Sequence, residues 1–309
     1  MSTLLPAVRE YLDLRRSFGY VLAGQDRPLA DFAGYLERIG AETVTIAAAL
    51  AWAVEPATTP LRHSQRLAMV RGFATYLHAI DPGCEIPPKD LLPEGRRRVP
   101  PHIYSDAEIA ALMSASRLLH PAFRAATIET AIGLLVVTGM RSGELARLER
   151  TDVNLRTGRL RIIATKFQKS RELALHPSTV EVLDTYRRER DRYFPHAASA
   201  AFFLSCRGTR LSQAALERSF AWLVDEAGLA PPPGSRARRP RLHDARHSFT
   251  VATVLGWHRD DLDVQSLLPA LSAQLGHADP ASTYWYLTGV PELLAVTAKR
   301  VRTAREGER

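Results

Sequence analysis

The chain has 309 residues, enough for two domains, and 46% of them are hydrophobic, as in a globular protein. Its longest apolar stretches fall far short of the ~20 residues needed to cross a bilayer. The N-terminus lacks the basic start and apolar core of a secretion signal, so we expect a cytoplasmic protein with no membrane span. Cys84 and Cys206 are too few for a disulfide framework or a cysteine-rich zinc site.

The net charge of +8 is unevenly distributed along the chain. Up to Gly95 there are nine Lys or Arg against eleven Asp or Glu, a net charge of −2, so the remainder carries +10. A basic excess favours a polyanionic partner such as nucleic acid. If that partner is DNA, most of the attraction comes from the second part of the chain; the alternative is an arginine-rich chain that is merely soluble.

The first 90 residues show the apolar spacing of helices, and the pattern predicts four of them, the third at 46–54. Six prolines follow between Asp81 and Pro101, together with three consecutive arginines at 96–98. This composition predicts a linker at 91–101 between a domain at 1–90 and a second at 102–309. The linker arginines fit a solvated tether and contact with a phosphate backbone equally well.

The second domain is predicted to be mainly α-helical with a small antiparallel β-sheet. "SDAE" at 105–108 is a capping box that opens a helix, and an apolar helix at 123–137 stops at Gly139. Alternating apolar residues at 160–164 and 173–175 predict a hairpin with lysines at its tip. "AFFLS" at 201–205 is a candidate extended segment, and an amphipathic helix ends at Gly228. Further helices are expected at 243–255, 264–275, 281–287 and 291–302.

Cationic side chains stand at the ends of these predicted elements, where they can converge on a ligand. The residues are Arg141, Lys166, His243, Arg246 and His277. Such a set suits a phosphate whose charge grows in a transition state, because each arginine can give two parallel hydrogen bonds to its oxygens.

A zinc-hydrolase site is the competing interpretation of "HDARH" at 243–247. His243 and His247 have the spacing of two metal ligands, with Asp244 as a base. The surrounding cations would raise the electrostatic cost of a metal ion, and zinc needs neutral histidines. We therefore favour the phosphate site, with Asp244 as a helix-start or ion-pairing residue.

Four segments in order resemble the motifs of the tyrosine recombinase, or phage integrase, family. They are "TGMRSGELARL" at 138–148, "TKFQKSREL" at 165–173, "HDARHSF" at 243–249 and "LGHADPASTYWYL" at 275–287. "RLAMVRGFATYLHAIDP" at 66–82 resembles the last helix of that family's core-binding domain. The resemblance implies an N-terminal helical, SAM-like core-binding domain that binds DNA and a catalytic domain with the DNA breaking-rejoining fold.

The resemblance also implies roles for the three motif cations that contact the scissile phosphate and the leaving group. Arg141 and Arg246 match the two arginines that bind the phosphate. Lys166 matches the hairpin lysine that protonates the leaving 5′-oxygen, with Lys169 as a neighbouring alternative. "TKFQK" replaces a glycine-rich turn at this point.

The resemblance likewise implies roles for the histidines and identifies the nucleophile. His243 matches the residue that moves the proton of the nucleophile, and His277 matches a phosphate hydrogen-bond donor. The family spacing of nine residues after that histidine selects Tyr286 over Tyr284 as the nucleophile. His247 is expected to be a structural histidine.

Other basic residues are candidates for contacts with the DNA backbone outside the catalytic set. They are Arg62, Arg66, Arg71, Arg96, Arg97, Arg98, Lys169, Arg238 and Arg239. The first three belong to the last helix of the N-terminal domain and are expected to form a basic face on it.

The resemblance implies a site-specific recombinase or integrase of a mobile or integrative element, which cleaves and rejoins double-stranded DNA through a 3′-phosphotyrosyl intermediate. It implies no metal, no other cofactor and no ATP. The partners would be duplex DNA and three further copies of the chain, forming a tetramer on paired sites from free monomers. Accessory recombinases or DNA-bending proteins are further candidate partners, and the DNA-bound enzyme would associate with the nucleoid. The alternatives are a type IB topoisomerase-like enzyme and a non-catalytic DNA-binding protein of the same fold.

Overall fold

The computed structural model describes residues 4–20, 22, 24–93, 100–163, 170–235 and 237–276. The chain divides into two compact units, Met1–Val99 and Pro100–Arg309. Among the described residues, no helix is long and apolar enough to span a membrane.

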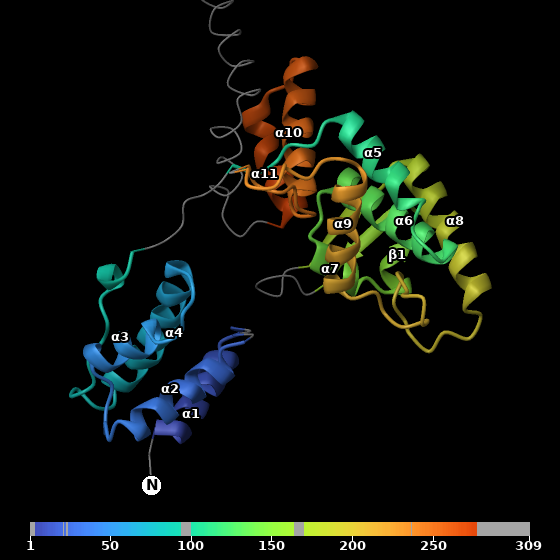
Figure 1. The fold of residues 1–309 in the computed structure, drawn as a ribbon. Helices are drawn as coiled ribbons and strands as arrows, with labels where there is room; N and C mark the ends of the chain where they lie inside the picture. Colours follow the sequence, from blue (N-terminus) through green and yellow to red (C-terminus); the bar gives the residue numbers. More distant parts are fainter. Residues whose placement is uncertain are drawn as a thin grey trace, which may run out of the picture. The chain divides into compact units, whose positions relative to one another are not determined.

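The first unit is built from four helices, coloured blue to teal in Figure 1. They are α1 (Leu4–Ser17), α2 (Asp26–Arg38), α3 (Ile46–Val54) and α4 (Pro60–His78), followed by a short 3-10 helix, η1 (Lys89–Leu91). Helices α3 and α4 begin where Thr45 and Thr59 accept a backbone N–H with their side chains, as helix N-caps do. The apolar face of each helix meets in one core around Phe32, Trp52 and Phe73, which are fully buried.

The second unit holds the other helices of the described chain, with α6 at the centre of most of them. The helices are α5 (Asp106–Ser116), α6 (Ala122–Thr138), α7 (Ser142–Arg147), η2 (Arg150–Asp152), α8 (Pro177–Tyr193), α9 (Gln213–Glu226), α10 (Asp244–Arg259) and α11 (Val264–Leu275). Helix α6 packs against α5, α7, α8 and α10, and its apolar residues are buried on nearly every side. A helix that is apolar all round belongs in the centre of a layered domain, which accounts for this position.

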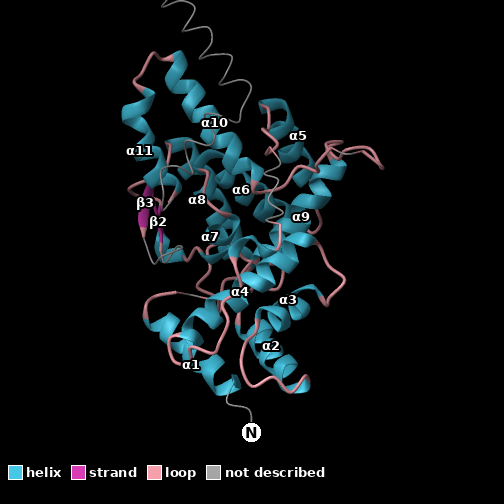
Figure 2. Cartoon of the chain, turned by 90° about the vertical axis from the view of Figure 1, so that its left-hand side faces the viewer, coloured by secondary structure: helices cyan, strands magenta, loops and turns pink. Residues whose placement is uncertain are grey.

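A three-stranded antiparallel sheet, ordered β1-β2-β3, lies at one side of the second unit. Its strands are β1 (Val153–Asn154), β2 (Arg159–Ile162) and β3 (Arg171–Ala174). In β2 the buried residues Leu160 and Ile162 alternate with exposed arginines, as in a strand with one face on the core. Leu160 faces Leu173 across the β2–β3 pair. Figure 2 shows the sheet next to α11, in agreement with the packing of β3 against that helix.

Helices α10 and α11 share a smaller core of their own. Val254 and Leu275 are fully buried in it, and Asp263 caps the start of α11 by accepting the N–H groups of the first turn. Tyr104, at the entry to the unit, donates its backbone N–H to the Ser248 hydroxyl at 2.8 Å. This bond fixes the start of the second unit to α10.

The fold class expected from the sequence is confirmed: the described chain is mostly helical with a small antiparallel sheet. The capping box at Ser105 and Glu108 is present, and α6 ends at Gly139. The segment 201–205 forms isolated bridges at Ala201 and Leu204. Strand β1 and helix α7 were not anticipated. The hairpin tip at 164–169 and the helices expected at 281–287 and 291–302 lie outside the described residues.

Candidate functional site

The turn after α6 delivers Arg141 to the start of α7. Gly139 closes α6 with φ of 63°, a left-handed conformation that glycine adopts without strain. A Cβ at this position would also collide with the ring of Phe249 on α10. Two independent constraints therefore require glycine two residues before the first motif arginine.

Arg141 is held by two acceptors from different parts of the chain. Its Nη1 donates to Glu144 Oε1 at 2.7 Å, and its Nη2 donates to the carbonyl oxygen of Gly276 at 3.0 Å. Its backbone N–H donates to Glu144 Oε2 at 2.9 Å, which closes the first turn of α7. The guanidinium is thereby fixed, and 31% of the side chain is still exposed.

Arg246 lies on the inner face of α10 and joins the same region from the opposite side. The residue is 2% exposed. Its Nη1 donates to the Gly139 carbonyl at 2.9 Å and its Nη2 to the Leu275 carbonyl at 2.6 Å. The two motif arginines, far apart in sequence, therefore meet at the end of α6 and the end of α11.

Glu144 and Arg171 complete this arrangement, and both were missed from the sequence. Arg171 donates from Nη1 and Nη2 to the two oxygens of Glu144, at 3.2 and 2.8 Å, and from Nε to the Gln274 carbonyl at 2.6 Å. Burial alone would raise the pKa of Glu144, but the bonds from Arg171 and Arg141 outweigh it and lower the pKa to about 2. Glu144 is therefore an ionised carboxylate inside the protein.

Two features of the sequence could have pointed to this pair. Glu144 stands three residues after Arg141, the spacing of a capping box. Arg171 has the same strand parity as the buried Leu173, so it points to the inner face, where an arginine needs an acidic partner.

The end of α11 is the common attachment point of these side chains. The carbonyls of Gln274, Leu275 and Gly276 accept, in that order, from Arg171, Arg246 and Arg141. The last carbonyls of a helix have no partners within the helix, and the helix dipole places negative charge there. Three guanidinium groups are a favourable way to satisfy them, and they fix the backbone immediately before His277.

His243 precedes α10 and is exposed. Desolvation by the neighbouring protein lowers the pKa of its ring, and the nearby cations Arg246 and Arg241 lower it further. The ring meets that of His247 edge-on, with centroids 5.2 Å apart. A small pocket of about 350 Å³ adjoins His243 and is lined by α9 and residues 239–243. A neutral imidazole at this place can accept a proton at neutral pH.

Asp244 is unavailable to a metal ion. It is fully buried and accepts from Arg238 Nη2 at 3.1 Å and from the backbone N–H of Arg241 at 2.8 Å. These bonds match the ion-pairing role expected for it at the helix start. Within the described part of the chain, no group of three His, Cys, Asp or Glu residues is placed to hold a metal ion.

The remaining predicted catalytic residues fall outside the described part of the chain. Those residues are Lys166, His277 and Tyr286. The alternative nucleophile Tyr284 and four predicted DNA contacts also lie outside it, namely Lys169, Arg96, Arg97 and Arg98. The structure thus brings together Arg141, Arg246 and His243 from the predicted catalytic set.

The arginines predicted on α4 do not form one basic face. Arg66 lies with its guanidinium carbon 3.6 Å from the centre of the Trp52 ring and donates to the Trp52 carbonyl at 3.0 Å. Arg71 donates to the carbonyls of Pro87 and Pro88, which follow α4. Arg62 is exposed and makes no ion pair with any described residue. At about 100° per residue, Arg62 and Arg71 also lie on opposite sides of the helix.

Arg238 and Arg239, also predicted to contact DNA, form ion pairs with carboxylates. Arg238 pairs with the buried Asp244, and Arg239 pairs with Asp225 on α9 at 2.7 Å. Arg238 contributes to the packing of the α10 start, and its side chain is 25% exposed.

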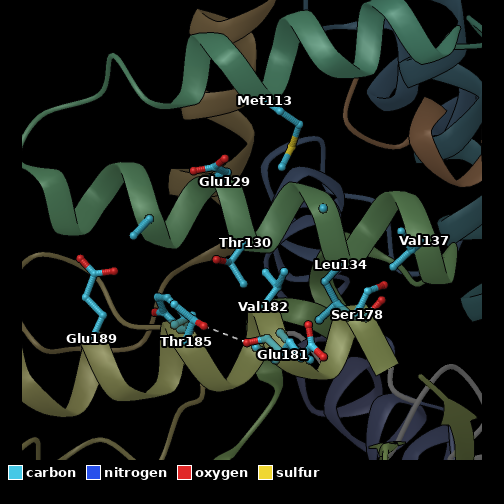
Figure 3. A pocket seen from close by; sticks show the side chains of 15 residues that line it. Met113, Glu129, Thr130, Leu134, Val137, Ser178, Glu181, Val182, Thr185 and Glu189 are labelled. Carbon is cyan, nitrogen blue, oxygen red and sulfur yellow. Dashed lines mark hydrogen bonds between the residues drawn. The ribbon is translucent and has the colours of Figure 1, made fainter. Parts of the chain in front are cut away.

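A larger pocket, of about 640 Å³, lies between α6 and α8 (Figure 3). Leu134 and Val137 from α6 face Val182 from α8 across it, with Met113 of α5 above. Glu181 and Glu189 are among its acidic residues. None of the predicted site residues lines this pocket.

Comparisons with known proteins show which family model and which relatives this chain matches. Residues 104–290 match the model of the phage integrase family. A putative integrase/recombinase of Sinorhizobium fredii (strain NBRC 101917 / NGR234), y4rB, is 40% identical over 308 residues, which are 97% of this chain and 98% of that relative.

Two solved structures share the fold. The XerH site-specific recombinase bound to a palindromic difH substrate aligns with a TM-score of 0.65 and 20% identity, over 88% of this chain and 77% of that one. The Tn1549 transposon integrase in complex with transposon right-end DNA aligns with a TM-score of 0.65 and 14% identity, over 96% of this chain and 99% of that one.

Proposed function

Because this chain belongs to the phage integrase family, and is a tyrosine recombinase that performs site-specific DNA recombination, we propose that it cleaves duplex DNA with Tyr286. The observation that carries the proposal is the convergence of Arg141 and Arg246 on adjacent carbonyls at the end of α11. Tyr286 follows this point in the sequence by ten residues. The family motifs assign phosphate binding to Arg141 and Arg246, so the scissile DNA phosphate would bind beside their guanidinium groups.

In the proposed reaction, Tyr286 attacks the phosphorus and forms a 3′-phosphotyrosyl ester, and a 5′-hydroxyl leaves. A tyrosine has a pKa near ~10, so its proton must be removed during attack, and His243 accepts it. Lys166 protonates the leaving oxygen. Arg141, Arg246 and His277 stabilise the charge on the non-bridging oxygens. One ester replaces another, so rejoining to a second 5′-hydroxyl needs neither ATP nor a metal ion.

The first unit serves as a core-binding domain in this proposal, and a tetramer holds two DNA sites through a Holliday junction. Arg62 is its exposed candidate for a phosphate contact on α4. The enzyme would act in the cytoplasm on nucleoid DNA, for a mobile or integrative element. Support for DNA as substrate comes from the basic excess of the second part of the chain and from solved relatives that are bound to DNA.

Covalent trapping tests the proposal. Cellular DNA fragments are incubated with the protein and a chelator, and any DNA joined to the protein is sequenced and rebuilt as a nicked duplex. The wild-type protein should accumulate on that duplex, whereas Tyr286→Phe should bind it with similar affinity and form no covalent complex. A covalent complex that persists in Tyr286→Phe and disappears in Tyr284→Phe would identify Tyr284 as the nucleophile instead. Relaxation of supercoiled plasmids that lack the site would indicate a topoisomerase instead.

A further inference from the structure

Arg171 shares the carboxylate of Glu144 with Arg141 and binds the same turn of backbone at the end of α11. The side chain of Arg141 donates to Glu144 Oε1 and to the Gly276 carbonyl. Arg171 donates to both oxygens of Glu144 and, through Nε, to the Gln274 carbonyl two residues before Gly276. Arg171 and Arg141 are thus linked on one side by Glu144 and on the other by the backbone from Gln274 to Gly276, without an observed bond between the two guanidinium groups.

The packing of Arg171 is as specific as its hydrogen bonding. Its side chain is 11% exposed and leaves β3 towards the end of α11. A Cβ on Gly276 would lie 2.6 Å from Arg171 Nη1, so the guanidinium rests directly on the glycine backbone. Gly276 also has φ of 67°, which favours glycine for a separate reason.

We propose that Arg171 is a positioning residue of the recombinase reaction, which orients the phosphate-binding Arg141 through Glu144 and the Gln274–Gly276 turn. This inference rests on the proposed function for its catalytic consequence. Arginine suits the task because its planar fork can bond a carboxylate with two nitrogens while Nε donates in a third direction. A lysine offers a single nitrogen and cannot reach Glu144 and Gln274 in the same way.

The positioning can be measured without DNA by ¹⁵N NMR of the full chain. A guanidinium whose Nη1 and Nη2 both donate hydrogen bonds rotates slowly about its Nε–Cζ bond. The Arg141 signal is identified by its disappearance in Arg141→Lys. We expect slow rotation of Arg141 in the wild type and fast rotation in both Arg171→Met and Arg171→Lys. The matched control is Arg159→Met, which removes an exposed arginine of the same sheet, paired with Glu172 at 3.0 Å. Slow rotation that survives in a folded Arg171→Lys would overturn the proposal.

The catalytic consequence is measured as the rate of covalent complex formation at saturating DNA. Misplacement of a catalytic group by about 1 Å costs roughly 100-fold in rate, and we expect a loss of that order in Arg171→Met and Arg171→Lys with DNA affinity nearly unchanged. Arg159→Met should react like the wild type. A wild-type rate in Arg171→Lys would contradict the proposal. A wild type that forms no covalent complex would refute the proposed function instead, and the NMR result would still decide the positioning.

A double-mutant cycle separates positioning from general stability. In an Arg141→Ala background the guanidinium that Arg171 orients is absent. Adding Arg171→Met should therefore slow cleavage further by no more than about twofold. If Arg171 contributes only stability to the fold, the two losses multiply, and that outcome would reject the assignment.

Discussion

Arg141 and Arg246 donate hydrogen bonds to adjacent carbonyls, those of Gly276 and Leu275, at 3.0 and 2.6 Å. One arginine comes from the turn after α6 and the other from the first turns of α10, so the end of α11 fixes their separation. A carbonyl acceptor orients a guanidinium without cancelling its charge. Glu144 offsets one positive charge through its bonds to Arg141 and Arg171. Three arginines against this one carboxylate still leave a net positive charge beside a bound phosphate.

Arg246→Lys should lose both stability and activity. Lysine cannot bridge the Gly139 and Leu275 carbonyls, so at least one buried acceptor loses its donor, which costs about 1–3 kcal/mol of unfolding free energy. The rate of covalent complex formation should also fall. Urea unfolding measures the first effect, with Arg117→Lys as the control because Arg117 forms an exposed ion pair with Glu129. The control should change the unfolding free energy by less than about 0.5 kcal/mol, and an equal loss in both variants would contradict the argument.

The sequence predicted the parts of the fold that depend on local pattern. The Ser105 capping box, the stop at Gly139 and the range of α11 follow from residues close in sequence. Strand β1 has two residues and α7 has six, too few to show an apolar period.

The cationic residues of the candidate site were predictable from the sequence, whereas the groups that hold them in place were not. Arg141, Arg246 and His243 were singled out by their places at the ends of predicted elements, and the resemblance gave them roles. The structure brings the first two to one helix end. Capping-box spacing and strand parity point to Glu144 and Arg171 separately, but their pairing depends on the tertiary packing of β3, which no local pattern encodes. For the same reason the carbonyl partners of Arg66 and Arg71 could not be foreseen.

Glu144 should make stability depend on pH in the acid range. Its folded pKa of about 2 lies below the ordinary 4.5, so its contribution is complete above about pH 4.5 and is lost as the pH falls towards 2. The shift corresponds to roughly 3 kcal/mol. The difference in unfolding free energy between the wild type and Glu144→Gln should therefore shrink between pH 4.5 and 2.5. Glu172→Gln is the control, because that carboxylate is 55% exposed, and its effect should stay under about 1 kcal/mol.

Gly139→Ala should be more damaging than Gly228→Ala. Both glycines have a left-handed φ, 63° and 68°, so alanine carries a similar backbone strain of about 1 kcal/mol at each. The new methyl group meets the Phe249 ring at position 139 and open space at position 228. The difference between the two losses in unfolding free energy therefore measures the steric contact. We also expect slower cleavage in Gly139→Ala alone, since that turn carries Arg141, and equal effects on stability would contradict the prediction.

Arg241→Gln should move the acid limb of the pH–rate profile to higher pH. His243 must be neutral to accept the tyrosine proton, so the rate of covalent complex formation falls as the ring becomes protonated. Desolvation and the neighbouring cations, among them Arg241, hold the pKa of His243 below its ordinary 6.5, which places the wild-type limb below pH 6.5. Removal of one cation raises that pKa.

The design separates this electrostatic effect from a loss of packing. Arg241 is 57% exposed and acts on His243 through charge, so Arg241→Lys should leave the limb where the wild type has it. His243→Gln should slow the reaction and remove the limb, which assigns the titration to this ring. If Arg241→Gln lowers the rate equally at every pH, the arginine contributes to DNA binding or packing, and His243 does not set the acid limit of the reaction.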